Sequence, residues 1–153
     1  MYYVMIITLI AADQVIKFLV RSNMAIGESL PMIEGALHLT HVSNSGAAFS
    51  ILQGQTTLLT IVPAVMIAAL LGCIYFYRKK GGALLLFSLS LICAGGAGNL
   101  IDRAARGTVT DYIDFRVFPV FNLADICVCC GCGLLVIYMI LLDRKEKGGN
   151  GEG

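Results

Sequence analysis

Residues 123–142 of this 153-residue chain read LADICVCCGCGLLVIYMILL, and this stretch decides the fold. It is apolar almost throughout, and its one charged residue, Asp125, lies close to its beginning. A helix needs about 20 consecutive, mainly apolar residues to cross the hydrocarbon core of a bilayer. The stretch therefore predicts a membrane-spanning helix with a carboxylate at one edge.

Three further stretches have about the length of a membrane span. They are residues 1–20, which Asp13 and Lys17 interrupt, residues 57–77 and residues 83–101. The chain as a whole is 58% hydrophobic and 14% charged, whereas soluble domains are about 45–50% apolar and about 25% charged. We therefore expect an all-α membrane protein with four transmembrane helices.

Two short basic segments set the expected orientation. Residues 78–80, Arg-Lys-Lys, separate the second span from the third, and residues 144–147, Arg-Lys-Glu-Lys, follow the fourth. Short loops rich in Lys and Arg face the cytoplasm. Both termini should then be cytoplasmic, with the two longer loops outside. We expect residues 1–147 to form one domain, and the Gly-rich residues 148–153 to form a disordered cytoplasmic tail.

This topology places the polar side chains of the spans at one depth. Asp13 and Lys17 lie in the outer half of the first span, at a rise of about 1.5 Å per residue. Asn99 lies near the outer end of the third span, and Asp125 lies at the outer edge of the fourth. Asp13 and Lys17 share a helix face, as do Asn99 and Arg103. Ionisable residues are costly in a membrane, so they indicate a functional site by default.

Each of these residues also has a purely structural interpretation. Asp13 and Lys17 could form an intrahelical ion pair that lowers the cost of insertion. Asn99 and Arg103 could cap the third helix, with the Arg103 guanidinium reaching the headgroups. Asp125 could simply interact with the positive end of a helix dipole. The convergence of the whole set at one depth favours a functional site.

Five strings of residues along the chain, in their order and spacing, resemble the lipoprotein signal peptidases (signal peptidase II). The strings are Asp13-Gln-Val-Ile-Lys17, Asn44-Ser-Gly-Ala-Ala-Phe-Ser50, Gly98-Asn-Leu-Ile-Asp-Arg103, Gly107-x-Val-x-Asp-Tyr-Ile-Asp114 and Phe121-Asn-Leu-Ala-Asp125. The resemblance covers the chain from the first span to the fourth. It implies a bacterial inner-membrane aspartic peptidase with four spanning helices, a small extracytoplasmic β-cradle and a flap between the third and fourth helices.

The resemblance also implies a substrate and a set of site residues. Members of that family remove the signal peptide from prolipoproteins just before a cysteine that carries diacylglycerol. By motif, Asp111 and Asp125 are the catalytic pair. The residues that match positions lining or bracing the site are Asp13, Lys17, Asn44, Asn99, Arg103 and Asn122. We interpret Asp102, next to Arg103, as a further bracing residue, and we expect Asp114 to face solvent.

Two neighbouring carboxyl groups cannot both ionise cheaply, so one keeps its proton near neutral pH. The ionised member can take a proton from water while the other hydrogen-bonds the scissile carbonyl. This chemistry needs no metal and no cofactor, and the sequence leaves open which Asp holds the proton. We expect a monomer in the bacterial cytoplasmic membrane, with its active site at the outer leaflet. Its partners should be lipid-modified prolipoproteins and membrane lipids, and not nucleic acid, since no basic patch with interleaved aromatics is present.

Two other kinds of protein would explain part of the sequence. A small four-helix ion-coupled transporter would use Asp13 and Asp125 as ion sites. It should, however, have polar residues along a whole pathway, whereas the cytoplasmic halves of the spans are nearly apolar. A non-catalytic assembly protein would explain the Gly- and Cys-rich residues 127–133 but not Asp111. We expect the four cysteines in this segment to make helix contacts.

The long loop between the first two spans carries a further pattern. Residues 36–42 alternate apolar and polar side chains, which predicts a short strand. His38 and His41 lie three apart in this strand and therefore face opposite sides, which argues against a metal pair. Residues 46–48, Gly-Ala-Ala, would let a peptide backbone come close.

Overall fold

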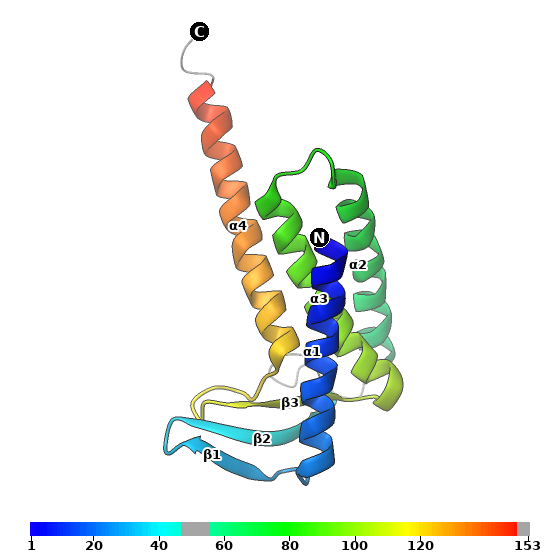
Figure 1. The fold of residues 1–153 in the computed structure, drawn as a ribbon, viewed down its shortest axis with the longest axis vertical. Helices are drawn as coiled ribbons and strands as arrows, with labels where there is room; N and C mark the ends of the chain where they lie inside the picture. Colours follow the sequence, from blue (N-terminus) through cyan, green and yellow to red (C-terminus); the bar gives the residue numbers. More distant parts are fainter. Residues whose placement is uncertain (47–55, 150–153) are drawn as a thin grey trace.

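The computed structural model describes residues 1–46 and 56–149. A small sheet lies at one end of a bundle of four helices (Figure 1), which are α1 (Tyr2–Asn23), α2 (Thr56–Tyr77), α3 (Ala83–Arg106) and α4 (Leu123–Gly149). All four helices are long and apolar enough to cross a membrane. The four spans predicted from the sequence are therefore confirmed, and α1, α3 and α4 each continue a few residues beyond their predicted ends.

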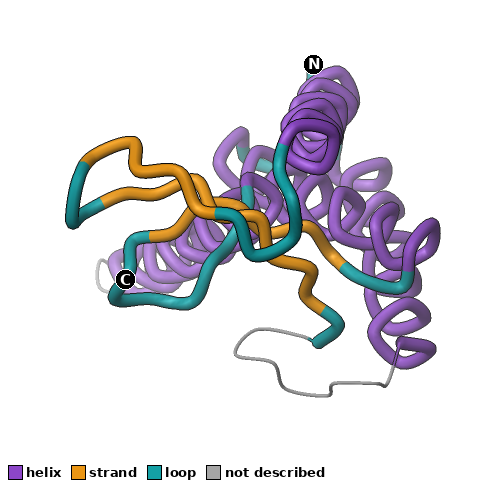
Figure 2. The backbone as a smooth tube through the Cα atoms, turned by 90° about the horizontal axis from the view of Figure 1, so that it is seen from below, coloured by secondary structure: helices purple, strands orange, loops and turns teal. Residues whose placement is uncertain are grey.

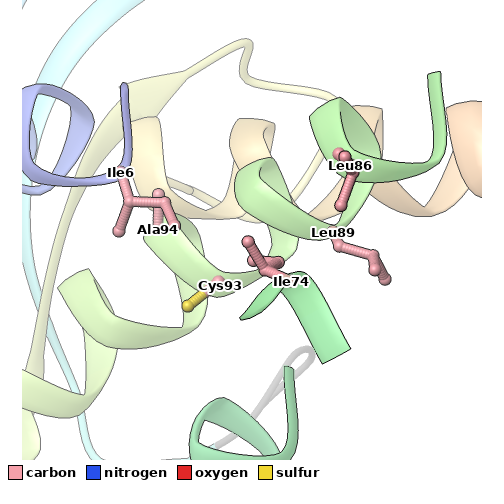
Figure 3. Packing of buried hydrophobic residues seen from close by; sticks show 6 residues of the cluster. All are labelled: Ile6, Ile74, Leu86, Leu89, Cys93 and Ala94. Atoms are coloured by element: carbon pink, nitrogen blue, oxygen red, sulfur yellow. The ribbon is translucent and has the colours of Figure 1, made fainter. Parts of the chain in front are cut away.

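The central helix of the bundle is α3, which packs against the other three. In its span 56% of the residues are buried, against 22% in α1, 11% in α4 and 6% in α2. One apolar cluster joins three helices (Figure 3) and consists of Ile6, Ile74, Leu86, Leu89, Cys93 and Ala94. Outward-facing apolar residues such as Val65 and Met139, 64% and 62% exposed, give the bundle a surface suited to lipid.

The α3 and α4 helices approach each other closely at Gly131. A Cβ atom added there would lie 2.8 Å from the backbone oxygen of Ser88 and 2.9 Å from the backbone nitrogen of Ile92. Small residues are what membrane helices use where their backbones come close. Gly131 therefore permits this close approach, as does Gly95 on α3, where an added Cβ would overlap the backbone of Ala124 in α4.

The cysteines of α4 play a smaller part in this contact than expected. Cys127 is buried, but Cys129, Cys130 and Cys132 are exposed. The prediction that all four cysteines make helix contacts is wrong for these three, because they lie on faces of α4 that turn away from α3.

The sheet has three antiparallel strands in the order β1-β2-β3 (Figure 2). They are β1 (Ser29–Ile33), β2 (Leu37–Asn44) and β3 (Val109–Asp114). The strand predicted over residues 36–42 corresponds to β2, while β1 and β3 were expected only through the family resemblance. The register pairs Asp111 with Val42, so the middle of β3 lies against the second half of β2.

The far end of β3 is tied into the sheet by polar side chains. Asp114 is only 6% exposed, and its carboxylate accepts hydrogen bonds from Thr40 Oγ1 at 2.8 Å and from the backbone N–H of Arg116 at 2.7 Å. The Thr40 hydroxyl also bonds that of Ser29 at 2.8 Å. The prediction that Asp114 faces solvent is therefore wrong, since the strand pairing buries it.

Some expected features fall at the limits of the described residues. Residues 47–50, which include two of the Gly-Ala-Ala residues, lie outside them, as do residues 150–153 of the expected tail. The α4 helix runs to Gly149 and so includes the first two residues of that tail. The connection from β3 to α4, where a flap is expected, contains Arg116 at a positive φ of 65°.

Candidate active site

Asp111 and Asp125 are joined by one residue, Asn122. The Asn122 Nδ2 atom donates a hydrogen bond to Asp111 Oδ1 at 2.6 Å. The backbone N–H of Asn122 donates to Asp125 Oδ2 at 3.1 Å, and Asn122 Oδ1 accepts from the backbone N–H of Asp125 at 3.0 Å. The two carboxyl groups are thus fixed relative to each other by a residue that contacts both.

The chain between β3 and α4 folds back along β3, which brings Asn122 to Asp111. The backbone of Phe121 pairs with that of Ile113, through N–H to O distances of 2.7 and 3.1 Å. The Tyr112 hydroxyl accepts a hydrogen bond from the backbone N–H of Leu123 at 3.1 Å. The α4 helix therefore begins beside the strand that carries Asp111, although the connection is short.

Asn122 and Asp125 also begin α4. Asn122 immediately precedes the helix, and its reciprocal bonds with Asp125, three residues later, have the form of a capping box. These bonds satisfy backbone N–H groups that the first turn of a helix leaves unpaired. The structural interpretation of Asp125 as a residue of the helix N-terminus therefore holds together with its place in the carboxyl pair.

Asp111 lies in a largely buried position, with 3% of its surface exposed. Its Oδ2 atom accepts a hydrogen bond from Asn44 Nδ2 at 2.9 Å. Burial, the strongest influence, raises the pKa of Asp111 to about 6, against the opposing hydrogen bond from Asn44. The negative charge of Asp125 also raises this pKa, while the hydrogen bond from Asn122 and the charge of Lys17 lower it. Asp111 is therefore a carboxyl group that can retain its proton in mildly acidic solution.

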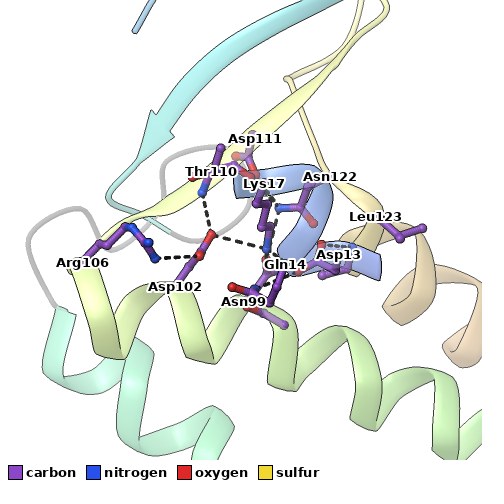
Figure 4. Close-up of polar contacts among 12 residues, drawn as sticks. Asp13, Gln14, Lys17, Asn99, Asp102, Arg106, Thr110, Asp111, Asn122 and Leu123 are labelled. Atoms are coloured by element: carbon purple, nitrogen blue, oxygen red, sulfur yellow. Dashed lines mark hydrogen bonds and ion pairs between the residues drawn. The ribbon is translucent and has the colours of Figure 1, made fainter. Parts of the chain in front are cut away.

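Asn99, on α3, supports the other carboxylate. Its Nδ2 atom donates to Asp125 Oδ1 at 2.8 Å. Its Oδ1 atom accepts from Lys17 Nζ at 2.8 Å and from Asn122 Nδ2 at 3.1 Å (Figure 4). Asn99 therefore links α1, α3 and the start of α4 at the carboxyl pair.

Asp13 and Lys17 form the i,i+4 ion pair of their structural interpretation, with Nζ 2.9 Å from Oδ2, and both are almost completely buried. Asp13 Oδ1 accepts a hydrogen bond from the backbone N–H of Ala124 at 3.1 Å. The Asp13–Lys17 ion pair therefore does not act within α1 alone, because Asp13 also binds the first turn of α4.

Asp102 braces β3, and its bonds go to residues other than Asp111 and Asp125. Its Oδ2 atom accepts from the backbone N–H of Thr110 at 3.0 Å, next to Asp111. It also lies 3.5 Å from Lys17 Nζ and 3.3 Å from Arg21 Nη1. Asp102 is fully buried, so these cations and the N–H group balance its charge.

Arg103, near the end of α3, contacts the segment that follows β2. Its Nη2 atom donates to the backbone oxygen of Gly46 at 2.9 Å, and Asn44 Oδ1 accepts from the backbone N–H of Gly46 at 2.9 Å. The structure thus brings all nine predicted site residues into one connected region, in which Asp111, Asn122 and Asp125 are central.

Three contributors to this region were not predicted. Gln14 donates to the backbone oxygen of Gly98 at 3.0 Å, and Arg21 donates to Thr110 Oγ1 at 3.0 Å. The sequence did carry a signal for Arg21, because it lies four residues after Lys17 and so on the same face of α1. The role of Thr110 depends on strand pairing, for which the sequence has no comparable signal.

An apolar groove of about 310 Å³ is lined by the sheet, the connection from β3 to α4 and the beginning of α4. Its lining includes Leu39 and Ile113, which are paired in register across β2 and β3. It also includes Tyr112, Phe121 and Ile126, the sequence neighbours of Asp111, Asn122 and Asp125. The elements that carry the site residues therefore also line the groove, but the two carboxyl groups are not part of its lining.

The histidines of β2 are occupied by other contacts. His38 Nδ1 lies 3.2 Å from Ser29 Oγ, and His41 Nδ1 lies 2.9 Å from the backbone oxygen of Met24. Among residues 1–46 and 56–149, no group of three or more His, Cys, Asp or Glu side chains could hold a metal ion.

Known proteins are similar to this chain over most of its length. A family model described as Signal peptidase (SPase) II matches residues 5–141. The lipoprotein signal peptidase of Halothermothrix orenii is 45% identical over 150 residues, which cover 98% of this chain and 100% of that protein. The lipoprotein signal peptidase of Bacillus subtilis (strain 168) is 39% identical over 153 residues, with 96% and 97% covered.

Solved structures show the same fold. A bacterial membrane enzyme determined by the in meso method at 2.3 Å resolution superposes with a TM-score of 0.86 at 32% identity, covering 99% of this chain and 92% of that one. A second bacterial membrane enzyme, determined at 1.9 Å, gives a TM-score of 0.79 at 33% identity, with 90% and 91% covered.

These matches confirm the resemblance of the five motifs and give no support to the transporter alternative. They also agree with the four apolar helices in making the chain a multi-pass membrane protein. Because the match extends over nearly the whole chain in both sequence and structure, the chain belongs to the signal peptidase II family.

Proposed function

We propose that this protein is an aspartic endopeptidase that removes the signal peptide from prolipoproteins carrying a diacylglyceryl group. The observation that carries the proposal is the carboxyl pair of Asp111 and Asp125, held together by Asn122 at the start of a membrane-spanning helix. The substrate class comes from the relatives, which are named lipoprotein signal peptidases. One chain contains both carboxyl groups, so a monomer is sufficient for the reaction.

The environments of the two carboxyl groups suggest different roles. Burial raises the pKa of Asp111 to about 6, which suits the member that keeps a proton. Asp125 lies in the first turn of α4, where the positive end of the helix dipole interacts favourably with a negative charge. We therefore assign the proton to Asp111 and the negative charge to Asp125 in the resting pair.

The reaction then follows from these two states. Asp125 takes a proton from a water molecule, whose oxygen bonds to the scissile carbonyl carbon. Asp111 gives its proton to the carbonyl oxygen, which becomes a hydroxyl of the tetrahedral intermediate. When the C–N bond breaks, Asp125 passes its proton to the leaving amine, and the hydroxyl proton returns to Asp111. Carboxyl groups supply every proton transfer, so the step needs neither a metal ion nor a cofactor.

The position of the site in the membrane follows from the charge distribution. The sheet and the carboxyl pair lie at one end of the bundle, whereas the basic turn at residues 78–80 and the end of α4 lie at the other (Figure 1). With the basic end in the cytoplasm, both termini are cytoplasmic and the carboxyl pair lies at the outer leaflet. The apolar groove lined by the sheet and the beginning of α4 lies at the same end of the bundle as the carboxyl pair. Apolar lining is typical of ligand grooves.

Cleavage by purified protein in detergent tests the proposal. The wild type should cleave a diacylglyceryl-modified prolipoprotein, and Asp111→Asn or Asp125→Asn should each reduce the rate by about three orders of magnitude or more. Asp143→Asn is the matched control, because Asp143 lies near the far end of α4 and pairs with Lys147 at 2.8 Å. Near-normal cleavage by either Asp111→Asn or Asp125→Asn would exclude the aspartic mechanism.

A further inference from the structure

Lys17 is a buried cation that the mechanism above does not use. Its side chain is 0% exposed. Its Nζ atom lies 2.9 Å from Asp13 Oδ2, 2.8 Å from Asn99 Oδ1 and 3.5 Å from Asp102 Oδ2 (Figure 4). Burying an ion pair often stabilises a protein no more than well-packed apolar residues would. Stability alone therefore gives little reason for a lysine at this position.

The ammonium group favours one orientation of the Asn99 amide, and so does Asn122 Nδ2, which donates to the same oxygen at 3.1 Å. An ammonium group has three donors and no acceptor, so only an amide oxygen can face it favourably. With Oδ1 directed at Lys17, the Nδ2 group faces Asp125 Oδ1 and donates to it at 2.8 Å. The reversed amide would place N–H groups against Nζ and an oxygen against the Asp125 carboxylate, both of which are repulsive.

We propose that Lys17 is a positioning residue for the peptidase reaction, acting through the Asn99 amide to orient the Asp125 carboxylate. This inference rests on the proposed function, because it concerns the group that activates water. The ion-pair partner of Lys17 acts in the same direction, since Asp13 Oδ1 accepts a hydrogen bond from the backbone N–H of Ala124 in the first turn of α4. Asp13 thus holds the helix end that carries Asp125, while Lys17 acts on the carboxylate itself through Asn99.

Other charges surround this region and must be considered in any test. They are Asp13 and Arg21 on α1, Asp102, Arg103 and Arg106 on α3, Asp111 on β3, and Asp125 on α4. The positive charge of Lys17 lowers the pKa of Asp111, so removing it raises that pKa. A variant without this charge should therefore lose activity at a higher pH than the wild type, which a purely structural residue would not cause.

A double-mutant cycle tests whether Lys17 acts through Asn99. Lys17→Met, Asn99→Ala and the double variant are compared on the lipidated precursor, each at its own optimal pH. Each single variant should lower kcat by about 10- to 100-fold, the loss expected for one hydrogen bond to a charged group, with little change in KM. The double variant should lose about as much as Asn99→Ala alone, because both changes break the same path. Losses that multiply would overturn the proposal.

Arg21→Met is the matched control. Arg21 is the cation one turn further along α1, and it contacts Asp102 at 3.3 Å and Thr110 at 3.0 Å. The fold-loss of kcat in Arg21→Met should multiply with the fold-loss in Asn99→Ala, since Arg21 and Asn99 serve different parts of the site. If the Arg21→Met/Asn99→Ala double variant also had the kcat of Asn99→Ala alone, the site would be disrupted in general and not along a specific path. That result would count against the proposal.

A second variant guards against misfolding. Lys17→Met leaves Asp13 buried without its cation, whereas Asp13→Asn together with Lys17→Met removes both charges and keeps an oxygen for the Ala124 N–H. The same cycle with Asn99→Ala in this background should again show overlapping losses. If the wild type cleaves the precursor and the losses multiply, only the role of Lys17 is rejected. If the wild type does not cleave it, the proposed function fails as well.

Discussion

At the scale of single residues, Asn122 makes Asp111 and Asp125 into one unit, because it donates to both carboxylates. Residues that act as a unit show strongly non-additive losses. We therefore expect the double variant Asp111→Asn/Asp125→Asn to have about the same residual kcat/KM as either single variant. A double variant that is slower by the product of the two single losses would show that the carboxyl groups act independently.

The protonation of Asp111 should set a pH limit for activity. Burial raises its pKa to about 6, so Asp111 is mainly protonated below that pH and mainly ionised above it. Because the mechanism needs the protonated form, kcat/KM should fall as the pH rises through about 6. Asn44→Ala removes a hydrogen bond that favours the ionised carboxylate, so the pKa should rise and the falling limb should move to higher pH.

The neighbouring variant Ser43→Ala is the control for this pH profile. Ser43 is exposed on β2 and bonds Thr108 at 2.9 Å, away from Asp111. The pH at which kcat/KM falls should be the same in Ser43→Ala as in the wild type. A limb that moved to lower pH in Asn44→Ala would contradict the assignment of the proton to Asp111.

The sequence predicts residue positions where spacing along one helix decides them. Asp13 and Lys17 were expected to share a helix face because they lie four residues apart, and they form an ion pair at 2.9 Å. Asp114 was misplaced because its burial depends on Thr40, which lies on another strand. Contacts between distant segments depend on register, and no pattern within either segment determines that register.

At the scale of elements, Gly131 is one of the glycines that permit the close approach of α3 and α4. Gly131→Ala would place a Cβ atom 2.8 Å from a backbone oxygen of α3, so the two helices would have to move apart. Overpacking of this kind costs roughly 1–3 kcal/mol, and we expect a lower Tm in detergent. Gly133→Ala is the matched control, because no atom lies within 4 Å of its added Cβ. An unchanged Tm for Gly131→Ala would show that the contact yields easily.

The helices were predictable as elements because a membrane span needs only length and apolar composition. The strands were harder, because each is short and needs a partner. β3 has six residues and pairs with β2 across a sequence separation that includes two whole helices. Its polar residues, Thr110, Asp111 and Asp114, give no simple alternation, so only the family resemblance pointed to it.

At the scale of the whole molecule, the distribution of basic residues predicts the orientation in the membrane. Reporter fusions after Lys80 and at the C-terminus should report the cytoplasm, whereas fusions near Gly35 and Gly107 should report the outside. The reason is the concentration of Lys and Arg in residues 78–80 and 144–147. If the fusions at Gly35 and Lys80 reported the same side, the four-span topology would be wrong.

The location of the carboxyl pair at the end of the spans also bears on substrate choice. A diacylglyceryl anchor keeps the peptide in the membrane near the pair, which raises its effective concentration. We expect the same prolipoprotein without its lipid to be cleaved at least about tenfold more slowly, measured as kcat/KM. Equal rates on the two precursors would show that the protein does not select for the lipid.

The ion pair within α1 has a consequence for how the molecule is made. During synthesis α1 reaches the membrane first, while Asn99, Asp102 and Ala124, which later bond Lys17 or Asp13, do not yet exist. At that stage Asp13 and Lys17 can still form an ion pair with each other, because they lie four residues apart in the same helix. Asp125 arrives only with α4. The site is therefore completed by the last helix to insert, and a nascent chain that stops before α4 carries no assembled peptidase.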